Sequence, residues 1–489
     1  MKKVVLILLV LVLLTSVVAC SKGDDYPGEN TTTQRSDTGT AERVDDKGYI
    51  LDDLPELDFK NTEVNILSWI CYYKEWSDES TGEVIDNSLY YRDLNVEERL
   101  KIKLNVDQID GSNHYRAQFL QHISTLIASG DTTYDLIAQY SWVSGNATLK
   151  GLYVDIASTE YVDFSKPWWP QDIVQNTMIN GKVYFVTGDI APSMIYSTFI
   201  TVFNEQLIED FGLESPYDLV ESGKWTLDKL ISMTVPYFID KDSSGNASSG
   251  DLVGFAFWAD THTKAFMYGS GLRVIEVNND GEYVLSEMYS GPKMQDLVEK
   301  LNNWIFDNEG ILLADNIAGD GEMFRSGNAI FGEYDLYYMV AYLPSSTVFY
   351  GVVPTPKYNE AQEKYYSFYG NGVTTYSIPK TVVSIDLSSA VLEAMASESY
   401  RTVTPAIFET ALKSKYSPSP KASEMLDLIH DTIVTDIAPF YTDNLVGYME
   451  MRTILNSAKT GWASQYASIK TMLNKAVKNI NDKLYALDD

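Results

Sequence analysis

Residues 61–69 read NTEVNILSW and decide the fold of the first part of this 489-residue chain. Val64, Ile66 and Ser68 point to one side of an extended backbone, while Asn65, Leu67 and Trp69 point to the other side. This period of two predicts a β-strand that ends in an aromatic loop. The segments that follow show how this strand is built into a sheet.

Helices and strands alternate after this first strand. A helix is expected from Asn87 to about Leu100, and a strand over residues 102–106 follows it. A second helix is expected to begin at Asn113 and to end at Gly130, before a third strand over 136–138. Strand, helix, strand, helix, strand with short connections predicts an α/β sheet, largely parallel, with helices on both faces.

The rest of the chain suits a second lobe and a helical C-terminal third. Apolar strands are expected over residues 181–186 and 199–203. The stretch from 216 to about 350 holds its own helices and a strand at 329–331, so it indicates a second lobe. The extended connector 352–356 then returns to the first lobe. Further helices are expected over residues 387–402, 406–415, 422–431 and in a last amphipathic segment around 469–484.

The N-terminus is typical of an exported lipoprotein. Lys2 and Lys3 precede an apolar run over 4–14, which is shorter than the about 20 residues that a spanning helix needs. The small residues before Cys20 resemble the lipobox of bacterial lipoproteins, so residues 1–19 are expected to be a signal peptide and Cys20 to carry lipid. The alternative is an ordinary secretory signal with a coincidental cysteine. Residues 20–60 are expected to form the lipidated cysteine and a flexible tether.

The formal net charge of −31 limits the partners of the chain. A surface this acidic repels phosphate backbones, so nucleic-acid binding is not expected, and the charge gives no sign of a substrate with several negative charges. Cys20 and Cys71 are the two cysteines of the sequence. Once Cys20 carries lipid, no disulfide can form within one chain, and the core must supply the stability.

Several segments resemble one family of binding proteins. They are the strand Gly181-Lys182-Val183-Tyr184, the hinge sequence over 202–207, the Trp-Thr helix start at 223–227, and late helices over 393–399, 405–416 and 423–430. In this order, behind a lipobox, they resemble the family 1 extracellular solute-binding proteins of bacterial ABC importers, especially the carbohydrate-associated lipoproteins. The resemblance covers roughly residues 60–450.

The resemblance implies a two-lobed periplasmic-binding-protein-like α/β fold of type II, with hinge strands between the lobes. Lobe 1 would comprise residues 61–201 and 357–425, and lobe 2 residues 202–356 and 426–489. A monomer would capture a sugar or an oligosaccharide in the cleft between the lobes and deliver it to an ABC permease. It would be held on the outer face of the cell membrane by its lipid and would catalyse no reaction.

Candidate ligand-binding residues follow from the rule that ligands lie beyond the carboxyl ends of strands in open α/β sheets. A sugar site pairs aromatic rings with carboxylates and amides. Each aromatic residue selected in this way has packing in the core as its alternative role. The selected residues are Trp69, Tyr140, Trp142, Asp189, Tyr334, Asp335, Tyr369 and Asn371.

The polar loop over residues 240–251 has the ligand spacing of a calcium loop. Oxygen-bearing side chains stand at alternate positions and Gly245 at the sixth. The last position holds Asp where Glu is usual, and a flexible polar turn is the alternative. No cofactor is required, and structural calcium is the one metal that the pattern suggests. Its ligands would come from Asp240, Asp242, Ser244, Asn246 and Asp251.

Enzyme motifs are scarce in the sequence. No Gly-x-Ser-x-Gly elbow occurs, and the four histidines form no metal pair at helical spacing. A surface carbohydrate-cleaving enzyme remains the alternative, because a glycosidase needs only two carboxylates and the chain has 68 acidic residues. A binding protein for a peptide or another solute is the third possibility.

Overall fold

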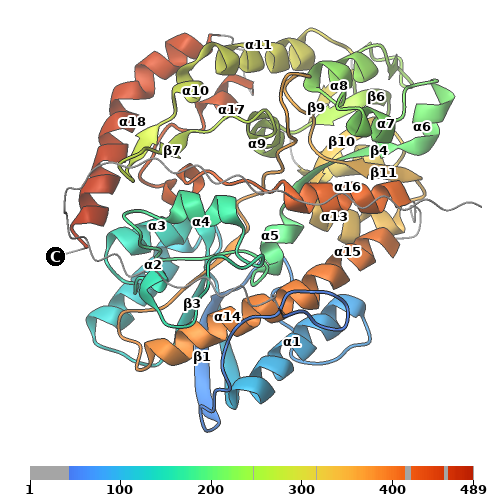
Figure 1. The fold of residues 1–489 in the computed structure, drawn as a ribbon. Helices are drawn as coiled ribbons and strands as arrows, with labels where there is room; N and C mark the ends of the chain where they lie inside the picture. The colour runs from blue at the N-terminus through green and yellow to red at the C-terminus, as the bar shows by residue number, and fades with distance from the viewer. Residues whose placement is uncertain (1–42, 246, 315–316, 414–419, 456–460, 488–489) are drawn as a thin grey trace, which may run out of the picture. The chain divides into compact units, whose positions relative to one another are not determined.

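The computed structural model describes residues 43–489 except 246, 315–316, 414–419, 456–460 and 488–489. The expected signal peptide, Cys20 and the calcium candidate Asn246 therefore lie outside the described residues. Two separate sheets organise the described chain, and they define the two lobes used below. Figure 1 shows β1 and β3 at the bottom of the view and β4, β10 and β11 at its upper right.

Lobe 1 is built on a four-stranded sheet with the order β12-β3-β1-β2. β1 pairs in parallel with both β2 and β3, whereas β12 runs antiparallel to β3. The expected parallel sheet is thus confirmed, and a strand from far along the chain completes it. The strands are β1 (Thr62–Trp69), β2 (Ile102–Ile109), β3 (Leu136–Tyr140) and β12 (Thr374–Ser377).

Helices cover both faces of this sheet, because β1 alternates its apolar side chains between two cores. Val64 and Ile66 belong to the larger core, which includes Leu89 of α1 (Val84–Leu100). Leu67 and Trp69 belong to a second core with Phe119 of α2 (Arg116–Ala128). The expected helix starts at Asn87 and Asn113 are wrong: α1 already begins at Val84, and α2 begins at Arg116 without a side-chain cap.

Lobe 2 is built on a six-stranded mixed sheet with the order β11-β4-β10-β6-β5, and β9 pairs with β6. β10 is parallel to β6 and antiparallel to β4. The expected strand over 181–186 is not formed, because Lys182 and Val186 make only isolated bridges. The strands are β4 (Phe199–Asn204), β5 (Phe238–Ile239), β6 (Leu252–Phe257), β9 (Ile311–Leu313), β10 (Ala329–Asp335) and β11 (Tyr350–Val353), with a separate hairpin of β7 (Ile275–Val277) and β8 (Tyr283–Leu285).

The remaining helices follow the strands and fill the C-terminal third, as expected. Up to residue 341 they are α3 (Ser141–Leu149), α4 (Gln171–Thr177), α5 (Pro192–Tyr196), α6 (Glu205–Asp210), α7 (Pro216–Glu221), α8 (Leu227–Thr234), α9 (Ala259–Gly269), α10 (Glu287–Ser290), α11 (Pro292–Phe306), α12 (Ile317–Arg325) and α13 (Leu336–Ala341). The C-terminal helices are α14 (Ile385–Arg401), α15 (Val403–Lys413), α16 (Pro420–Asp431), α17 (Glu450–Leu455) and α18 (Trp462–Tyr485).

The connections between the two sheets lie side by side. At the start of β4 the Phe199 N–H donates to the Phe368 carbonyl (2.8 Å), and the Val434 N–H donates to the Ser367 carbonyl (2.9 Å). Adjacent crossings of this kind form a hinge, because a few backbone dihedrals can change the angle between the sheets. The chain crosses just before β4 and again near residue 368. The expected boundary at 201/202 therefore lies after the first crossing, and the expected boundary at 356/357 lies before the second.

Residues 43–60 are packed on lobe 1, which corrects the expected end of the tether. Asp52 has 1% of its surface exposed and forms an ion pair with Arg99 of α1. Arg43 donates to the Asp52 carbonyl oxygen (2.6 Å). A buried carboxylate with an arginine partner fixes the backbone around it, so this part of the segment is not a free linker.

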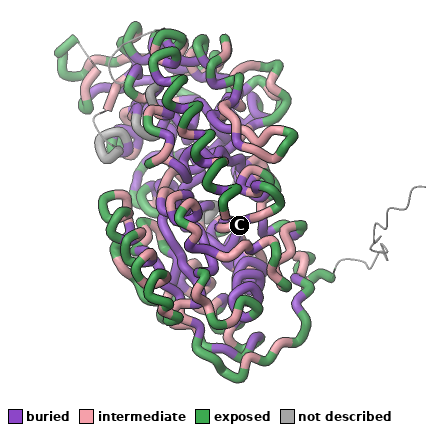
Figure 2. Tube along the Cα trace, turned by 90° about the vertical axis from the view of Figure 1, so that its left-hand side faces the viewer, coloured by how far each residue is buried: buried purple, intermediate pink, exposed green. Residues whose placement is uncertain are grey.

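Buried residues run through the interior of both lobes, and exposed residues line the outside (Figure 2). One apolar core includes residues of both sheets, such as Ile66 of β1 and Phe331 of β10. Among the described residues, no helix combines the length and the apolar character that crossing a membrane requires.

Candidate functional site between the lobes

The carboxyl ends of strands from the two sheets face each other. After β1 the chain turns into the loop that contains Tyr73, and β10 ends at Asp335. The Tyr73 hydroxyl donates to Asp335 Oδ2 over 2.8 Å, which joins lobe 1 to lobe 2. The ring of Tyr73 also stacks near Tyr196 (6.0 Å between centroids) and meets Tyr337 edge-on (5.2 Å). This contact lies where the strand-end rule places ligands.

The two carboxylate oxygens of Asp335 accept hydrogen bonds from different parts of the fold. Its Oδ1 accepts from the Tyr338 N–H (3.0 Å) and so caps α13, while Oδ2 accepts from Tyr73. Burial raises the pKa of Asp335 to about 6, although the hydrogen bonds from Tyr73 and Tyr338 work in the opposite direction. A carboxyl group with this pKa changes its charge in mildly acidic solution, so the contact between the lobes depends on pH.

Aromatic rings continue from this contact along the edge of lobe 1. Trp69, at the end of β1, meets Tyr72 (5.3 Å) and Tyr140 (5.0 Å), and Tyr140 meets Trp142 at the start of α3 (5.7 Å). Trp69 is fully buried, and its Nε1–H donates to Thr374 Oγ1 (2.9 Å). Tyr72 is 54% exposed and Trp142 is half-buried. Trp69 and Tyr140 therefore support the two rings that have free surface.

A cavity of about 220 Å³ lies between the lobes next to Trp142. Trp142 belongs to α3, which follows β3, and Lys264 belongs to α9, which follows β6. The loop before α17 and α17 itself close the remaining sides. Both lobes and the C-terminal segment thus contribute to one partly open space, whose lining residues are Trp142, Lys264, Thr442, Leu445, Val446, Gly447, Tyr448, Met449, Arg452 and Thr453.

The structure brings some of the predicted site residues together and separates others. Trp69, Tyr140 and Trp142 form one aromatic group, and Asp335 meets lobe 1 through Tyr73. The main-chain oxygen of Asn371 accepts from Ser141 Oγ (2.7 Å), next to this group.

The other predicted residues have partners inside the protein. Tyr369 lies at the crossing between the lobes and hydrogen-bonds Thr435. Tyr334 is buried and stacks on Tyr338, with 4.0 Å between the ring centroids.

Asp189 lies apart from this group, in a buried polar cluster. It accepts from Thr404 Oγ1 (2.5 Å) and lies 3.7 Å from Nε2 of His430. Burial by itself would lower the pKa of His430, but Asp189 and Asp431 raise it to about 10. Asp189 therefore anchors α15 and α16 in this structure. It is not among the residues that line the inter-lobe cavity.

Sequence reasoning misses Tyr73, Lys264, Tyr448 and Arg452. Tyr73 lies in the aromatic loop that the sequence indicates after the first strand, so the strand-end rule could have selected it. Lys264 follows β6, a continuous apolar run that shows no alternation and is hard to assign. Tyr448 and Arg452 come from a late segment that only the tertiary fold brings to the cavity.

The polar loop before β6 gathers carboxylates. Oxygens of Asp240, Asp242 and Asp251 lie within 4.8 Å of one another, and Asp251 is buried. Asp251 accepts from the main-chain N–H groups of Lys241 (2.7 Å) and Ser248 (2.8 Å), which orders the loop. Three close carboxylates fit the hard oxygen ligands that calcium prefers. Calcium binding at this loop stays a prediction.

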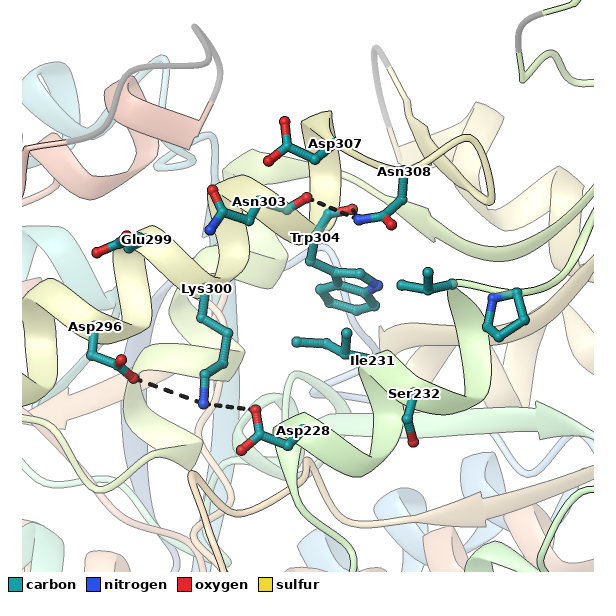
Figure 3. A pocket seen from close by; sticks show the side chains of 12 residues that line it. Asp228, Ile231, Ser232, Asp296, Glu299, Lys300, Asn303, Trp304, Asp307 and Asn308 are labelled. Atoms are coloured by element: carbon teal, nitrogen blue, oxygen red, sulfur yellow. Dashed lines mark hydrogen bonds and ion pairs between the residues drawn. The ribbon is translucent and has the colours of Figure 1, made fainter.

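A larger hollow of about 740 Å³ lies on the surface of lobe 2 (Figure 3). Its walls are α8 and α11 with the turns that follow them. Lys300 crosses the hollow and pairs with Asp228 (2.7 Å) and Asp296 (3.7 Å). All of its lining residues belong to one lobe, so a ligand bound there would not contact lobe 1.

Comparisons with known proteins place the fold. No family model and no curated protein matches the chain. Among solved structures, the galacto-N-biose/lacto-N-biose I-binding protein of the ABC transporter from Bifidobacterium longum, in complex with lacto-N-biose, matches with a TM-score of 0.57 at 12% identity, over 86% of this chain and 98% of that protein.

Two further matches have the same character. The extracellular solute-binding protein from Staphylococcus aureus in complex with maltose has a TM-score of 0.53 at 13% identity and covers 89% of this chain and 100% of its own. The ABC substrate-binding protein from Listeria monocytogenes in complex with cycloalternan has a TM-score of 0.50 at 15% identity, over 87% and 98%. The described chain therefore has the two-lobed α/β fold of the substrate-binding proteins of ABC transporters.

Proposed function

We propose that this chain is an extracellular solute-binding lipoprotein that captures a sugar or an oligosaccharide between its lobes and delivers it to an ABC importer. The observation that carries the proposal is the cavity at Trp142 and Lys264, to which both lobes contribute residues. A ligand that contacts both lobes favours their closed arrangement, and a permease can distinguish that arrangement from the open one. Binding of the ligand and closure of the lobes are then coupled.

The chemistry of the cavity and its rim suits a saccharide. Trp142 and Tyr448 offer aromatic faces for the C–H side of a sugar ring, and Thr442 offers a hydroxyl. Tyr72 extends the aromatic surface outside the cavity. The matching proteins are in complex with lacto-N-biose, maltose and cycloalternan. These observations support a saccharide over a peptide as the ligand.

The cavity is poorly equipped for hydrolysis. A glycosidase needs a pair of carboxyl groups that flank the bond to be cleaved. None of the described residues that line the cavity is a carboxylate. Asp335, one of the two acids predicted for the ligand site, is engaged by Tyr73 and by the start of α13. The proposal is therefore binding without catalysis, and the matching solved structures are likewise binding proteins.

Anchoring of the protein through Cys20 completes the proposal. A diacylated cysteine at the mature N-terminus would keep the lobes near a membrane permease, and two or three acyl chains bind a membrane stably. Replacing Cys20 with Ser should release the protein from the membrane fraction into the medium. Retention of the variant in the membrane would contradict lipid anchoring and leave solute binding unaffected.

The test of binding uses the purified chain and an oligosaccharide library. At a ligand concentration of about 100 times Kd, binding stabilises the folded state by about 2.7 kcal/mol, which a melting curve resolves. We expect a higher melting temperature with the sugar recovered unchanged. Shorter products in the incubation would favour the enzyme, and no shift with any saccharide would contradict the proposed ligand class.

A further inference from the structure

Glu75 is a buried acid in the loop that follows β1, and it does not line the inter-lobe cavity. Only 2% of its surface is exposed. Its Oε1 atom accepts hydrogen bonds from Thr374 Oγ1 (2.8 Å) and from the Ser193 N–H (3.1 Å). Burying a carboxyl group is costly, and hydrogen bonds offset that cost. The partners of Glu75 therefore indicate which parts of the fold it holds together.

The first partner connects Glu75 to the aromatic group beside the cavity. The Thr374 hydroxyl has one hydrogen to donate, which goes to Glu75, and its oxygen accepts from the Trp69 Nε1–H (2.9 Å). Trp69 meets Tyr140 (5.0 Å), and Tyr140 meets Trp142 at the cavity wall (5.7 Å). Glu75 thus orients the Trp69 indole through one hydroxyl group, and the packed rings extend that order to the cavity.

The second partner connects Glu75 to the hinge. Ser193 belongs to α5, which lies directly before β4 and the first crossing between the lobes. Thr374 begins β12, which follows the second crossing. The Thr374 N–H donates to Ser193 Oγ (2.8 Å), and the Gly370 N–H donates to the Ser197 carbonyl (2.9 Å). Glu75 therefore holds the lobe 1 ends of both hinge segments at one point.

The loop that carries Glu75 also reaches lobe 2. Arg92 of α1 donates through Nη2 to the Glu75 carbonyl oxygen (3.3 Å), which fixes the loop to lobe 1. Two positions before Glu75, the Tyr73 hydroxyl donates to Asp335 of lobe 2 (2.8 Å). A displacement of Glu75 would therefore be felt at the aromatic group, at the hinge and at the contact between the lobes.

We propose that Glu75 is a positioning residue that couples the aromatic group at the cavity to the hinge, through Thr374 on one side and Ser193 on the other. This inference rests on the proposed function and adds the route by which ring placement and the angle between the lobes depend on each other. Coupling between distant sites is carried by hydrogen-bond networks and packed side chains of this kind.

Two substitutions of Glu75 test the proposal by calorimetry on the purified chain with the saccharide selected from the library. Glu75→Leu leaves the Thr374 and Ser193 donors without their acceptor, so Kd should rise by about tenfold. Glu75 Oε2 has no hydrogen-bond partner among the described residues, and glutamine keeps one acceptor oxygen. Glu75→Gln should therefore preserve both hydrogen bonds and restore Kd to within about twofold of the wild-type value.

Glu393→Leu is the matched control for loss of a buried acid in lobe 1. Glu393 is 1% exposed and accepts from the indole N–H groups of Trp168 (3.2 Å) and Trp169 (2.9 Å), away from the cavity lining. Both leucine variants should lower the melting temperature, whereas only Glu75→Leu should change Kd. Thr374→Val, which removes the hydroxyl group between Glu75 and Trp69, is the second variant if Glu75→Leu does not fold.

Distances between labels on the two lobes, measured without ligand, give a second readout. Their distribution should be broader in Glu75→Leu than in the wild-type protein and unchanged in Glu393→Leu. A folded Glu75→Leu variant that matches the wild-type protein in either Kd or these distances would overturn the inference, as would equal changes in Glu393→Leu. If the wild-type protein binds no saccharide, the proposed function is wrong, and an unchanged distance distribution in Glu75→Leu would then overturn the role at the hinge as well.

Discussion

The cavity between the lobes and the hollow on lobe 2 differ in a way that volume does not show. The surface hollow is the larger, at about 740 Å³ against about 220 Å³. Its lining comes from α8 and α11 alone, whereas the cavity takes residues from α3, α9 and α17. Of these two sites, the cavity is the one in which a ligand would contact both lobes, so we expect it, and not the larger hollow, to serve the proposed function.

The two sites also differ in whether their polar side chains already have hydrogen-bond or ion-pair partners within the protein. In the surface hollow Lys300 pairs with Asp228, and the Trp304 indole donates to Thr234 Oγ1 (3.0 Å). In the cavity the Trp142 indole has no acceptor among the described residues. A site whose polar groups are already paired gains little from a ligand, and one with a buried free donor gains more.

The largest expected effect is that of Trp142→Ala on ligand affinity. Removing a central aromatic anchor of a binding site costs more than about 2 kcal/mol, so Kd should rise by about thirtyfold or more. Asn303→Ala in the surface hollow is the matched control and should leave Kd unchanged. Calorimetry with the saccharide selected from the library measures both variants. Equal losses in the two variants would remove the distinction between the sites.

The second effect is a dependence of stability on pH that arises at the contact between the lobes. Because the folded state raises the pKa of Asp335 from 3.8 to about 6, it holds a proton that the unfolded state has lost in this range. Stability should therefore fall as the pH rises from 4 to 6, by about 2–3 kcal/mol.

Denaturant unfolding at pH 4, 5 and 6 measures this dependence. Burial raises the pKa of Asp436 to about 6 as well, so the informative quantity is the difference between the wild-type protein and Asp335→Asn. The variant should show a shallower slope with pH. The same slope in both proteins would mean that Asp335 does not titrate in this range.

The third effect concerns the carboxylate loop of lobe 2, which lies outside the cavity. If calcium binds there, a concentration of about ten times Kd should stabilise the protein by about 1.4 kcal/mol, without changing saccharide affinity. Asp240→Asn should abolish the stabilisation, and Asp280→Asn, an exposed acid elsewhere in lobe 2, should not. Thermal melts with and without calcium decide between a metal site and a polar turn.

The smallest expected effect is that of Tyr73→Phe, which removes the hydrogen bond between the lobes. A single hydrogen bond contributes about 0.5–1.5 kcal/mol, so the population should shift toward separated lobes and Kd should rise about fivefold. Tyr72→Phe is the control, because the Tyr72 hydroxyl accepts a hydrogen bond from the Asn113 N–H of the same lobe (3.3 Å). Distances between labels on the two lobes report the shift.

Periodicity predicts the elements of lobe 1 well, because Val64 and Ile66 face one core and Leu67 faces another. It does not predict β6, where Leu252–Phe257 is apolar throughout and buried on both sides. The sequence also leads to a predicted tether that extends too far, to residue 60. The residues around Asp52 do not show that its carboxylate pairs with Arg99.

The same limit applies to the site. The strand-end rule selects Trp142 and Asp335, because each stands at the end of a strand or just after one. The partner of Asp335 is Tyr73, which is 262 positions away, and only the tertiary fold joins them. Asp189 satisfies the same rule and yet pairs with Thr404 and His430, because the rule takes no account of which helices later cover a loop.

A crystal structure of the protein with its tightest-binding saccharide tests the central claim most directly. The account predicts that the sugar lies against Trp142, with its polar groups toward Lys264 and Arg452 and with the lobes in contact through Tyr73 and Asp335. Sugar density in the hollow between α8 and α11, or on an outer face of one lobe, would contradict it.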